Sequence, residues 1–211
     1  VPIDPHFFLN RKIRAFILGL MVTGFLFGFA DLLWDRNFER LHVFLFNLCA
    51  GGFIIIYHTE NRSEPSIFSY LFLGMSLLYA LSAFFHFYIS AALLSFSLAL
   101  LVETVRVRTF SFIPADLFDF QVSVVDKFHH ASVLCLSLGL LIATLVLVNS
   151  SALHWIQNKN LTLDVFFLGF SFPVSLITMS VMFSFIKRDI GPMLRMVKQL
   201  FFWIINVGVI I

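Results

Sequence analysis

Charged residues are scarce in this sequence. Of its 211 residues, 12% are charged and 60% are hydrophobic, and the mean hydropathy is +0.95. Soluble domains carry roughly twice that charged fraction. A soluble core of this size could not hide so much apolar surface, whereas a lipid bilayer can. The composition therefore excludes a soluble domain, and the net charge of only +2 gives no reason to expect a nucleic-acid partner.

Cysteine is also scarce, and the common catalytic motifs are missing. Cys49 and Cys135 each lie in the middle of an apolar run, which argues against a disulfide framework and against a CxxC redox or zinc motif. The chain contains no GxGxxG, GxxxxGKS, GxxxxGKT, HExxH or GxSxG pattern. A soluble-type nucleophilic enzyme or a nucleotide-dependent enzyme is therefore not expected.

What the sequence has instead is a series of long apolar segments. Helix is the expected form because lipid offers the backbone no hydrogen-bond partner, and about 17–25 residues cross the hydrocarbon. The stretch from Ile67 to Val105 is too long for one crossing, so it is predicted to form two helices joined by a tight turn near His86–Tyr88. We predict an all-α, polytopic transmembrane helical bundle. It is a single domain over residues 1–211 of a longer chain, with about seven spans at residues 15–33, 41–57, 67–84, 88–105, 131–148, 163–186 and 200–211.

The basic residues alternate between the predicted loops. Lys and Arg are enriched in cytoplasmic loops of membrane proteins. Eleven of the 14 Lys and Arg fall in the N-terminal segment and in the loops after the second, fourth and sixth spans, whereas three (Arg36, Arg40 and Lys159) fall in the opposite loops. This split predicts a cytoplasmic N-terminus. It also predicts that the long loop 106–130 and the basic segment 187–199 lie along the cytoplasmic surface of the membrane.

Ionisable residues avoid the centres of the predicted spans. A charged side chain inside a membrane is costly, so its position is a strong functional clue. Asp31, Glu103 and Asp164 lie at span ends, which argues against a proton-driven pump. The histidines follow the same pattern. The predicted topology places His42, His86 and His154 near the outer face and His58, His129 and His130 near the inner face.

These histidines suggest a haem or metal site. Membrane b-type cytochromes hold haem iron between histidines of neighbouring helices. His42 with His86 is a candidate outer pair, and His58 with His130 is a candidate inner pair. His42 and His58 lie about 24 Å apart along one helix and on nearly opposite faces, so a single haem or metal at the outer surface fits better than two stacked haems. The candidates for binding a metal ion are His129, His130 and His154.

The middle of the second span and a proline in the sixth indicate a different kind of site. Asn47, which precedes Gly51, is the most polar position at mid-membrane, where it could bond another helix or line a cavity. Pro173 is expected to kink its helix and free a carbonyl. The segments HVFLFNLCAG and HASVLCLSLG share a first His and a tenth Gly, as an inverted repeat of a transporter would. Asn47, Gly51 and Pro173 are therefore the alternative, mid-membrane site.

Two helix starts resemble those of known haem and copper proteins. LHVFLFNLCAGG and KFHHASVLCLSLG are similar to histidine-bearing helices of bacterial membrane proteins such as the NnrS group and the heme–copper oxidase superfamily. The adjacent pair His129-His130 resembles a copper-binding pair of the oxidases. The resemblance covers two spans, and the HxxxY-type partner and the paired distal histidines of the oxidases are not found here.

Three interpretations remain open. In the first, the chain is an integral membrane subunit that carries haem b or a metal ion near the outer face and exchanges electrons with quinol or a partner subunit. In the second, it is a transporter or permease domain with the mid-membrane site. In the third, it is a structural or sensory subunit without ligand chemistry. All three predict a lipid bilayer around the chain and other membrane subunits or a second copy as partners. The resemblance implies the bacterial inner membrane.

Overall fold

The computed structural model describes residues 11–33, 38–62, 64–155, 167–186 and 191–210 and is 85% helix, with no strand in those ranges. Five helices within these ranges are long and apolar enough to cross a membrane. They are α1 (Arg11–Asp31), a three-part helix over Phe38–Glu60, α4 (Ile67–Phe84), α5 (Tyr88–Thr109), and a helix over Val124–Leu153 that joins α6 (Val124–Val148) to η4 (Asn149–Leu153).

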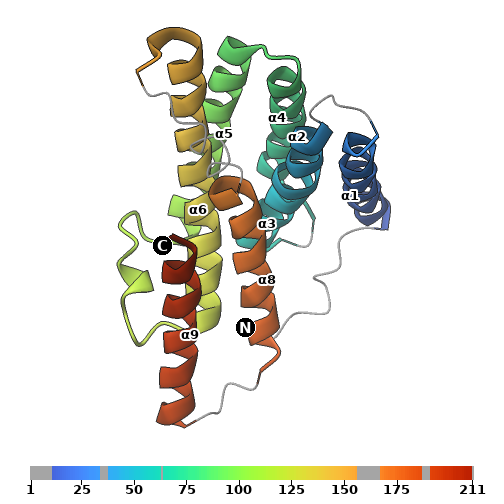
Figure 1. Cartoon of the computed structure of the whole chain (residues 1–211). Coiled ribbons are helices and arrows are strands. Elements are labelled where there is room, and N and C mark those ends of the chain that lie inside the picture. Colours follow the sequence, from blue (N-terminus) through green and yellow to red (C-terminus); the bar gives the residue numbers. More distant parts are fainter. Residues whose placement is uncertain (1–10, 34–37, 63, 156–166, 187–190, 211) are drawn as a thin grey trace.

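The other elements are shorter or less regular. The three-part helix consists of α2 (Phe38–Val43), the π-helical segment η2 (Phe44–Gly51) and α3 (Gly52–Glu60). The segment η4 is also π-helical, and a further π-helical segment, η5 (Phe167–Ser171), leads into α8 (Phe172–Ser184). The loop between α5 and α6, residues 110–123, contains the short helix η3 (Ala115–Leu117), and α9 (Pro192–Ile210) comes last. Successive long helices run in opposite directions (Figure 1).

Serine side chains begin two of the helices. Ser66 accepts hydrogen bonds from the backbone N–H groups of Phe68 and Ser69 at 3.0 and 3.3 Å, which caps α4. Ser123 accepts from the N–H of Asp126 at 3.1 Å and caps α6 in the same way. Between α4 and α5 the chain reverses at His86, whose φ of 61° is left-handed. The predicted tight turn in the long apolar stretch is thus confirmed.

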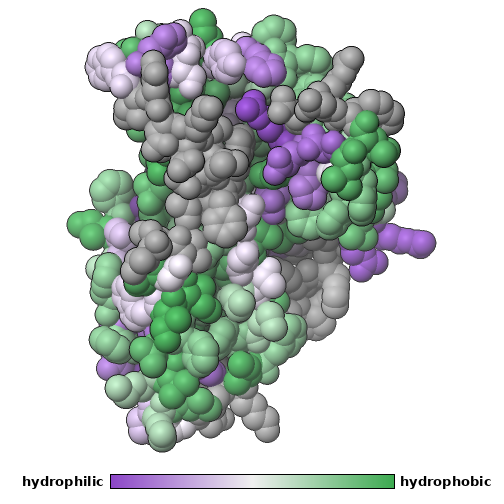
Figure 2. Space-filling view, viewed as in Figure 1, coloured by the Kyte–Doolittle hydropathy of each residue, from purple (hydrophilic) through white to green (hydrophobic). Residues whose placement is uncertain are grey.

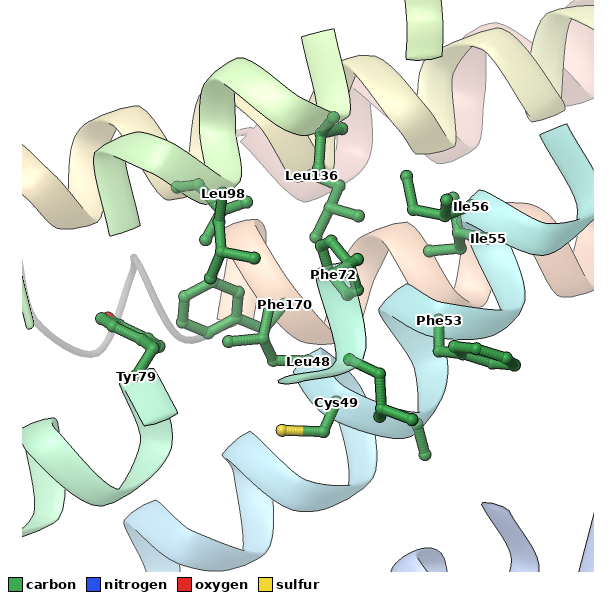
Figure 3. Packing of buried hydrophobic residues seen from close by; sticks show 14 of the residues in the cluster. Leu48, Cys49, Phe53, Ile55, Ile56, Phe72, Tyr79, Leu98, Leu136 and Phe170 are labelled. Atoms are coloured by element: carbon green, nitrogen blue, oxygen red, sulfur yellow. The ribbon is translucent and has the colours of Figure 1, made fainter. Parts of the chain in front are cut away.

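Helix α6 occupies the centre of the bundle, where it contacts α3, α5, α8 and α9. Three small residues, Ala91, Ser95 and Ala99, are buried on one face of α5. The Ser95 hydroxyl donates to the carbonyl oxygen of Leu140 at 2.8 Å, so the two helices approach closely. Figure 3 shows the core that forms beside this contact, which contains Leu48, Cys49, Phe72, Leu136 and Phe170.

Large apolar side chains also cover the outside of the bundle. Leu26 of α1 is 62% exposed and Leu93 of α5 is 65% exposed, and α4, α6 and α9 carry such residues too, whereas the buried helix Phe38–Glu60 has none. Apolar surface continues over the lower front of the molecule (Figure 2). Water would disfavour such a surface, whereas lipid suits it. The helices are therefore those of a membrane protein.

Several predicted boundaries shift in the structure. Helix α6 begins seven residues before the predicted start at 131, so His129 and His130 lie inside it rather than ahead of it. The predicted loop 106–130 shortens to 110–123 for the same reason, because hydrogen-bonded caps extend both flanking helices. Helix α9 begins at Pro192 rather than near residue 200. The predicted start of the sixth span, at 163, lies outside the described residues.

Candidate functional site

Two of the three π-helical segments in the described ranges, η2 and η5, meet in the middle of the bundle, and the third, η4, ends the α6 helix. Segments η2 and η5 contact each other, and the Asn47 amide nitrogen donates to the Ser171 hydroxyl oxygen at 3.0 Å across that contact. A π-helix joins residues five apart by hydrogen bonds, is rare, and is frequently found at functional sites. Here η2 and η5 face each other at Asn47, the residue that the sequence predicts to be polar at mid-membrane. We call this the η2–η5 contact.

Small residues allow this close approach. A Cβ atom added at Gly51 would lie 2.4 Å from a methyl carbon of Val174, just after Pro173. A Cβ added at Gly139 would lie 2.2 Å from the Cα of Gly169, so α6 and η5 cross backbone to backbone. The Pro173 carbonyl accepts a hydrogen bond from the Ser132 hydroxyl at 2.7 Å. The η2–η5 contact is thus tightly packed.

The structure brings together the three residues predicted for the mid-membrane site. Asn47 and Gly51 lie on η2, and both meet the segment around Pro173. Pro173 is the second residue of α8, and the irregular π-helical turn is the segment η5 just before it. The two similar sequence segments differ in form, since HVFLFNLCAG is largely π-helical and HASVLCLSLG is regular α-helix. Ser171, the actual partner of Asn47, was not predicted, because a lone serine in an apolar run carries no distinguishing signal.

A second group of polar side chains lies at the C-terminal end of α5, beside the α5–α6 loop. Its centre is Arg106, which is 2% exposed. The guanidinium donates from Nε and Nη2 to the two carboxylate oxygens of Glu103, at 2.9 and 2.5 Å. It also donates to the carbonyl oxygens of Ser111 and Phe112, at 3.0 and 2.9 Å. The fifth donor contacts Nε2 of His130 at 3.0 Å, so every N–H of the side chain is used.

This arrangement fixes the protonation of His130. A guanidinium can only donate, so Nε2 of His130 must be the acceptor and its proton must lie on Nδ1. The ring is buried and stacks on Phe110 with a centroid distance of 4.4 Å and an interplanar angle of 7°. Nδ1 has no hydrogen-bond partner among the described residues. His130 is therefore held as a neutral side chain against a cation.

The neighbouring histidines extend this group. The ring of His129 lies at right angles to that of Phe110, with a centroid distance of 5.1 Å, and contacts the ring of His58 at 4.7 Å. The Thr59 hydroxyl donates to the carbonyl of Ile55, so it accepts from Nε2 of His129 at 2.9 Å. His58 therefore contacts His129, the neighbour of the predicted His130. We call the whole group the His–Arg cluster; it contains His58, Thr59, Glu103, Arg106, Phe110, His129 and His130.

The histidines predicted for the outer face do not contact one another. His42 packs between Phe25 and Phe46, and its Nδ1 lies 3.0 Å from the carbonyl oxygen of Gly24 on α1. A carbonyl can only accept, so Nδ1 carries the proton and Nε2 keeps its lone pair. His86 is exposed on the α4–α5 turn, and its ring contacts Tyr88. The predicted pairing of His42 with His86 has no direct contact to support it.

The candidate metal ligands are also separated. His154 follows the far end of the helix that contains His129 and His130, so it lies about 36 Å from His130 along the axis. These three residues therefore do not form one site. Within the part of the chain that the structure describes, no group of three His, Cys, Asp or Glu residues is placed to hold a metal ion. Cys49 and Cys135 are free thiols, as the sequence indicated.

One of the residues counted among the loop charges is a buried lysine. Lys127 on α6 is fully buried, and its ammonium donates to the side-chain oxygen of Gln199 on α9 at 2.7 Å. The rings of Phe120 and Phe202 lie 5.6 and 5.8 Å from the nitrogen, which adds cation–π attraction. The amide nitrogen of Gln199 donates to the carbonyl of Val122 at 3.0 Å. These contacts join α9 to α6 and to the α5–α6 loop.

Comparisons with known proteins add no relative to this picture. No family model, no curated protein and no solved structure matches the chain.

Proposed function

We propose that the chain is a transporter or permease domain whose substrate path crosses the bundle at the η2–η5 contact. The observation that carries this proposal is the hydrogen bond from Asn47 to Ser171 between two facing π-helical segments. Interrupted helices near the membrane centre are the elements from which many transporters build their sites. Irregular backbone at that depth is tolerated where protein buries it or a cavity needs it.

The chemistry of the contact suggests the substrate class. Its polar groups are an amide, two hydroxyls and a carbonyl, supplied by Asn47, Ser171, Ser132 and Pro173. None of these groups is charged. A neutral molecule that both donates and accepts hydrogen bonds would match them. The tight packing at Gly51 and Gly139 makes this the closed state, which must open for passage.

A native cysteine provides the test. Cys49 lies in η2, two residues after Asn47, and is fully buried. In a Cys135→Ser variant in membranes, Cys49 becomes the single thiol. A charged, membrane-impermeant methanethiosulfonate reagent reaches it only if a water-filled path opens at the contact. We expect slow labelling in the native membrane and complete labelling after denaturation.

The alternative outcome is equally clear. If only denatured protein reacts, or if only a membrane-permeant maleimide reacts, no aqueous path opens and the transport proposal is wrong. A matched control is Ser137→Cys in a variant that lacks both native cysteines. Ser137 is also buried, but it lies on α6 rather than on η2. A path along η2 should leave this position unlabelled.

We also propose seven crossings with a cytoplasmic N-terminus. Beyond the five long helices, η5 with α8 would supply the sixth crossing and α9 the seventh. The support is the loop charge: Arg195 and Lys198 of α9 lie at the same end of the bundle as the α5–α6 loop, where Arg195 donates to the carbonyl of Gln121. Single cysteines at Phe87 and Phe112, which are both exposed, test the orientation. An impermeant reagent outside the cell should label Phe87→Cys and spare Phe112→Cys, and the reverse result would invert the topology.

The redox interpretation is the second candidate, and His42 carries it. Metal-bound histidines commonly donate the other ring N–H to a backbone carbonyl, as His42 does to Gly24. This leaves Nε2 as a ligand for haem iron or a metal ion, although no second histidine contacts it among the described residues. A reduced-minus-oxidised absorption band that is lost in His42→Ala and kept in His154→Ala would support this candidate. A colourless, metal-free protein would remove it.

A further inference from the structure

The Arg106 side chain hydrogen-bonds the start of the α5–α6 loop to the bundle, next to the stacking of Phe110 on His130. Arg106 holds the backbone carbonyls of Ser111 and Phe112, which are the first residues of the loop after Phe110. The same guanidinium is fixed by Glu103 and His130. All five of its donors are in use, so its position depends on each of these partners. Any change that displaces Arg106 therefore reaches the loop directly.

We propose that His130 makes this fastening a pH-sensitive latch. Protonation of His130 would place a hydrogen on Nε2, where Arg106 already donates at 3.0 Å. Two donors would then point at each other, and two cations would be in contact inside a buried cluster. Either the histidine ring or the guanidinium must move. Arg106 is the residue that holds the loop, so acidification at this end of the bundle loosens residues 111 and 112.

The charges around His130 favour this outcome. On α5 it faces Arg106 and Glu103, and both carboxylate oxygens of Glu103 are already bound to Arg106. Asp116 of the loop is the other nearby acid, and it accepts a hydrogen bond from the Ser111 hydroxyl at 3.1 Å. On α6 the adjacent residue is His129, which contacts His58 of α3. A second imidazolium there would add repulsion.

Water can reach the edge of the latch, and loosening of the loop start can affect α9. The Glu103 side chain is 35% exposed, which gives water access to the edge of the cluster. The far end of the loop is held by α9, through Arg195 at the carbonyl of Gln121 and Gln199 at that of Val122. A loosened loop start would therefore change the support of α9. This latch lies apart from the η2–η5 contact and does not depend on the proposed transport function.

A spin label on the loop tests the proposal. The label is a nitroxide on Phe112→Cys in a variant that lacks Cys49 and Cys135. The Phe112 side chain is 72% exposed, and Arg106 bonds only the backbone carbonyl of this residue, so the substitution keeps that hydrogen bond. Spectra in lipid are compared at about pH 7.5 and in steps down to about pH 4, because the proton must enter a buried site beside a cation. We expect the ratio of mobile to immobile signal to rise about tenfold on acidification, as for the loss of one charge-assisted hydrogen bond.

Three variants make the result specific. His130→Gln keeps an acceptor for Arg106 but cannot titrate, so its label should stay immobile at every pH. His154→Gln, at the other end of the same helix, should respond as the parent does. Arg106→Gln should be mobile at every pH, and it replaces His130→Gln if that variant does not fold. A parent without any pH response overturns the latch, and so does a response that His130→Gln or Arg106→Gln retains unchanged.

Discussion

The crossing of α6 and η5 makes a strong prediction about Gly139. In a Gly139→Ala variant the new Cβ would lie 2.2 Å from the Cα of Gly169 and 2.9 Å from its carbonyl carbon and oxygen. Ordinary contact begins at 3.4 Å, so the backbone of η5 must move by about 1.2 Å. No side chain can absorb this movement, because both surfaces are backbone. Ser171, two residues after Gly169, would move with it and strain its bond to Asn47.

The magnitude follows from three opposing effects. Overpacking of a close contact costs about 1–3 kcal/mol. A weakened interhelical hydrogen bond in a membrane adds about 0.6 kcal/mol. Replacing glycine by alanine in a helix returns about 0.5–1 kcal/mol. The net loss is about 1–3 kcal/mol, which for a chain of this length lowers the unfolding temperature by roughly 3–9 °C.

Thermal unfolding of the detergent-solubilised protein measures this loss. A thiol-reactive fluorophore reports unfolding as Cys49, fully buried in the folded protein, becomes accessible. The matched control is Gly74→Ala on the exposed face of α4, where a Cβ would meet nothing within 4 Å. Gly74→Ala should be as stable as the parent or slightly more stable. If Gly139→Ala matches Gly74→Ala, the backbone contact between α6 and η5 is wrong.

Three other substitutions probe the remaining contacts. Asn47→Ala should raise the alkylation rate of Cys49 about threefold, the equivalent of one average interhelical hydrogen bond, and an unchanged rate would mean that the bond to Ser171 does not hold the contact closed. Lys127→Met should change the unfolding temperature little, because an apolar residue of similar size replaces a costly buried charge. Gln199→Leu should lower it by several degrees, since the ammonium then keeps only the aromatic rings. Equal effects of these last two changes would contradict the buried lysine–amide bond.

The local pattern of the chain was enough to predict its long helices. Apolar length identified α4 as residues 67–84 without error, and the excess length of the stretch to Val105 predicted the turn at His86. These features depend on hydrogen bonds within a helix and on the thickness of a bilayer, so neighbouring residues determine them. Boundaries set by polar side chains were less predictable. The cap at Ser123 starts α6 seven residues before its apolar run, inside a segment that resembles a loop.

The candidate sites show the same division. Asn47, Gly51 and Pro173 were identified as unusual residues in apolar surroundings, and the fold brings them together. Ser171 was not, because it lies more than a hundred residues from Asn47 in the chain and any of many serines would serve as its partner. The histidines lie on elements at the two ends of the bundle, in the groups that the sequence predicts, and the structure adds a contact between His58 and His129. His58 meets His129 because the rotation of α3 against α6 turns that ring toward it.

The sequence by itself thus determined that the chain is a helical membrane protein and where its long helices lie, because hydrophobic length and backbone hydrogen bonding are local properties. Only the tertiary structure decided that Arg106, counted at first as a loop charge, is a buried residue with all five donors satisfied. It alone showed which residues these few charged groups contact. The few ionisable groups near the bundle core are held by helices far apart in the chain, and their contacts depend on how those helices rotate and cross.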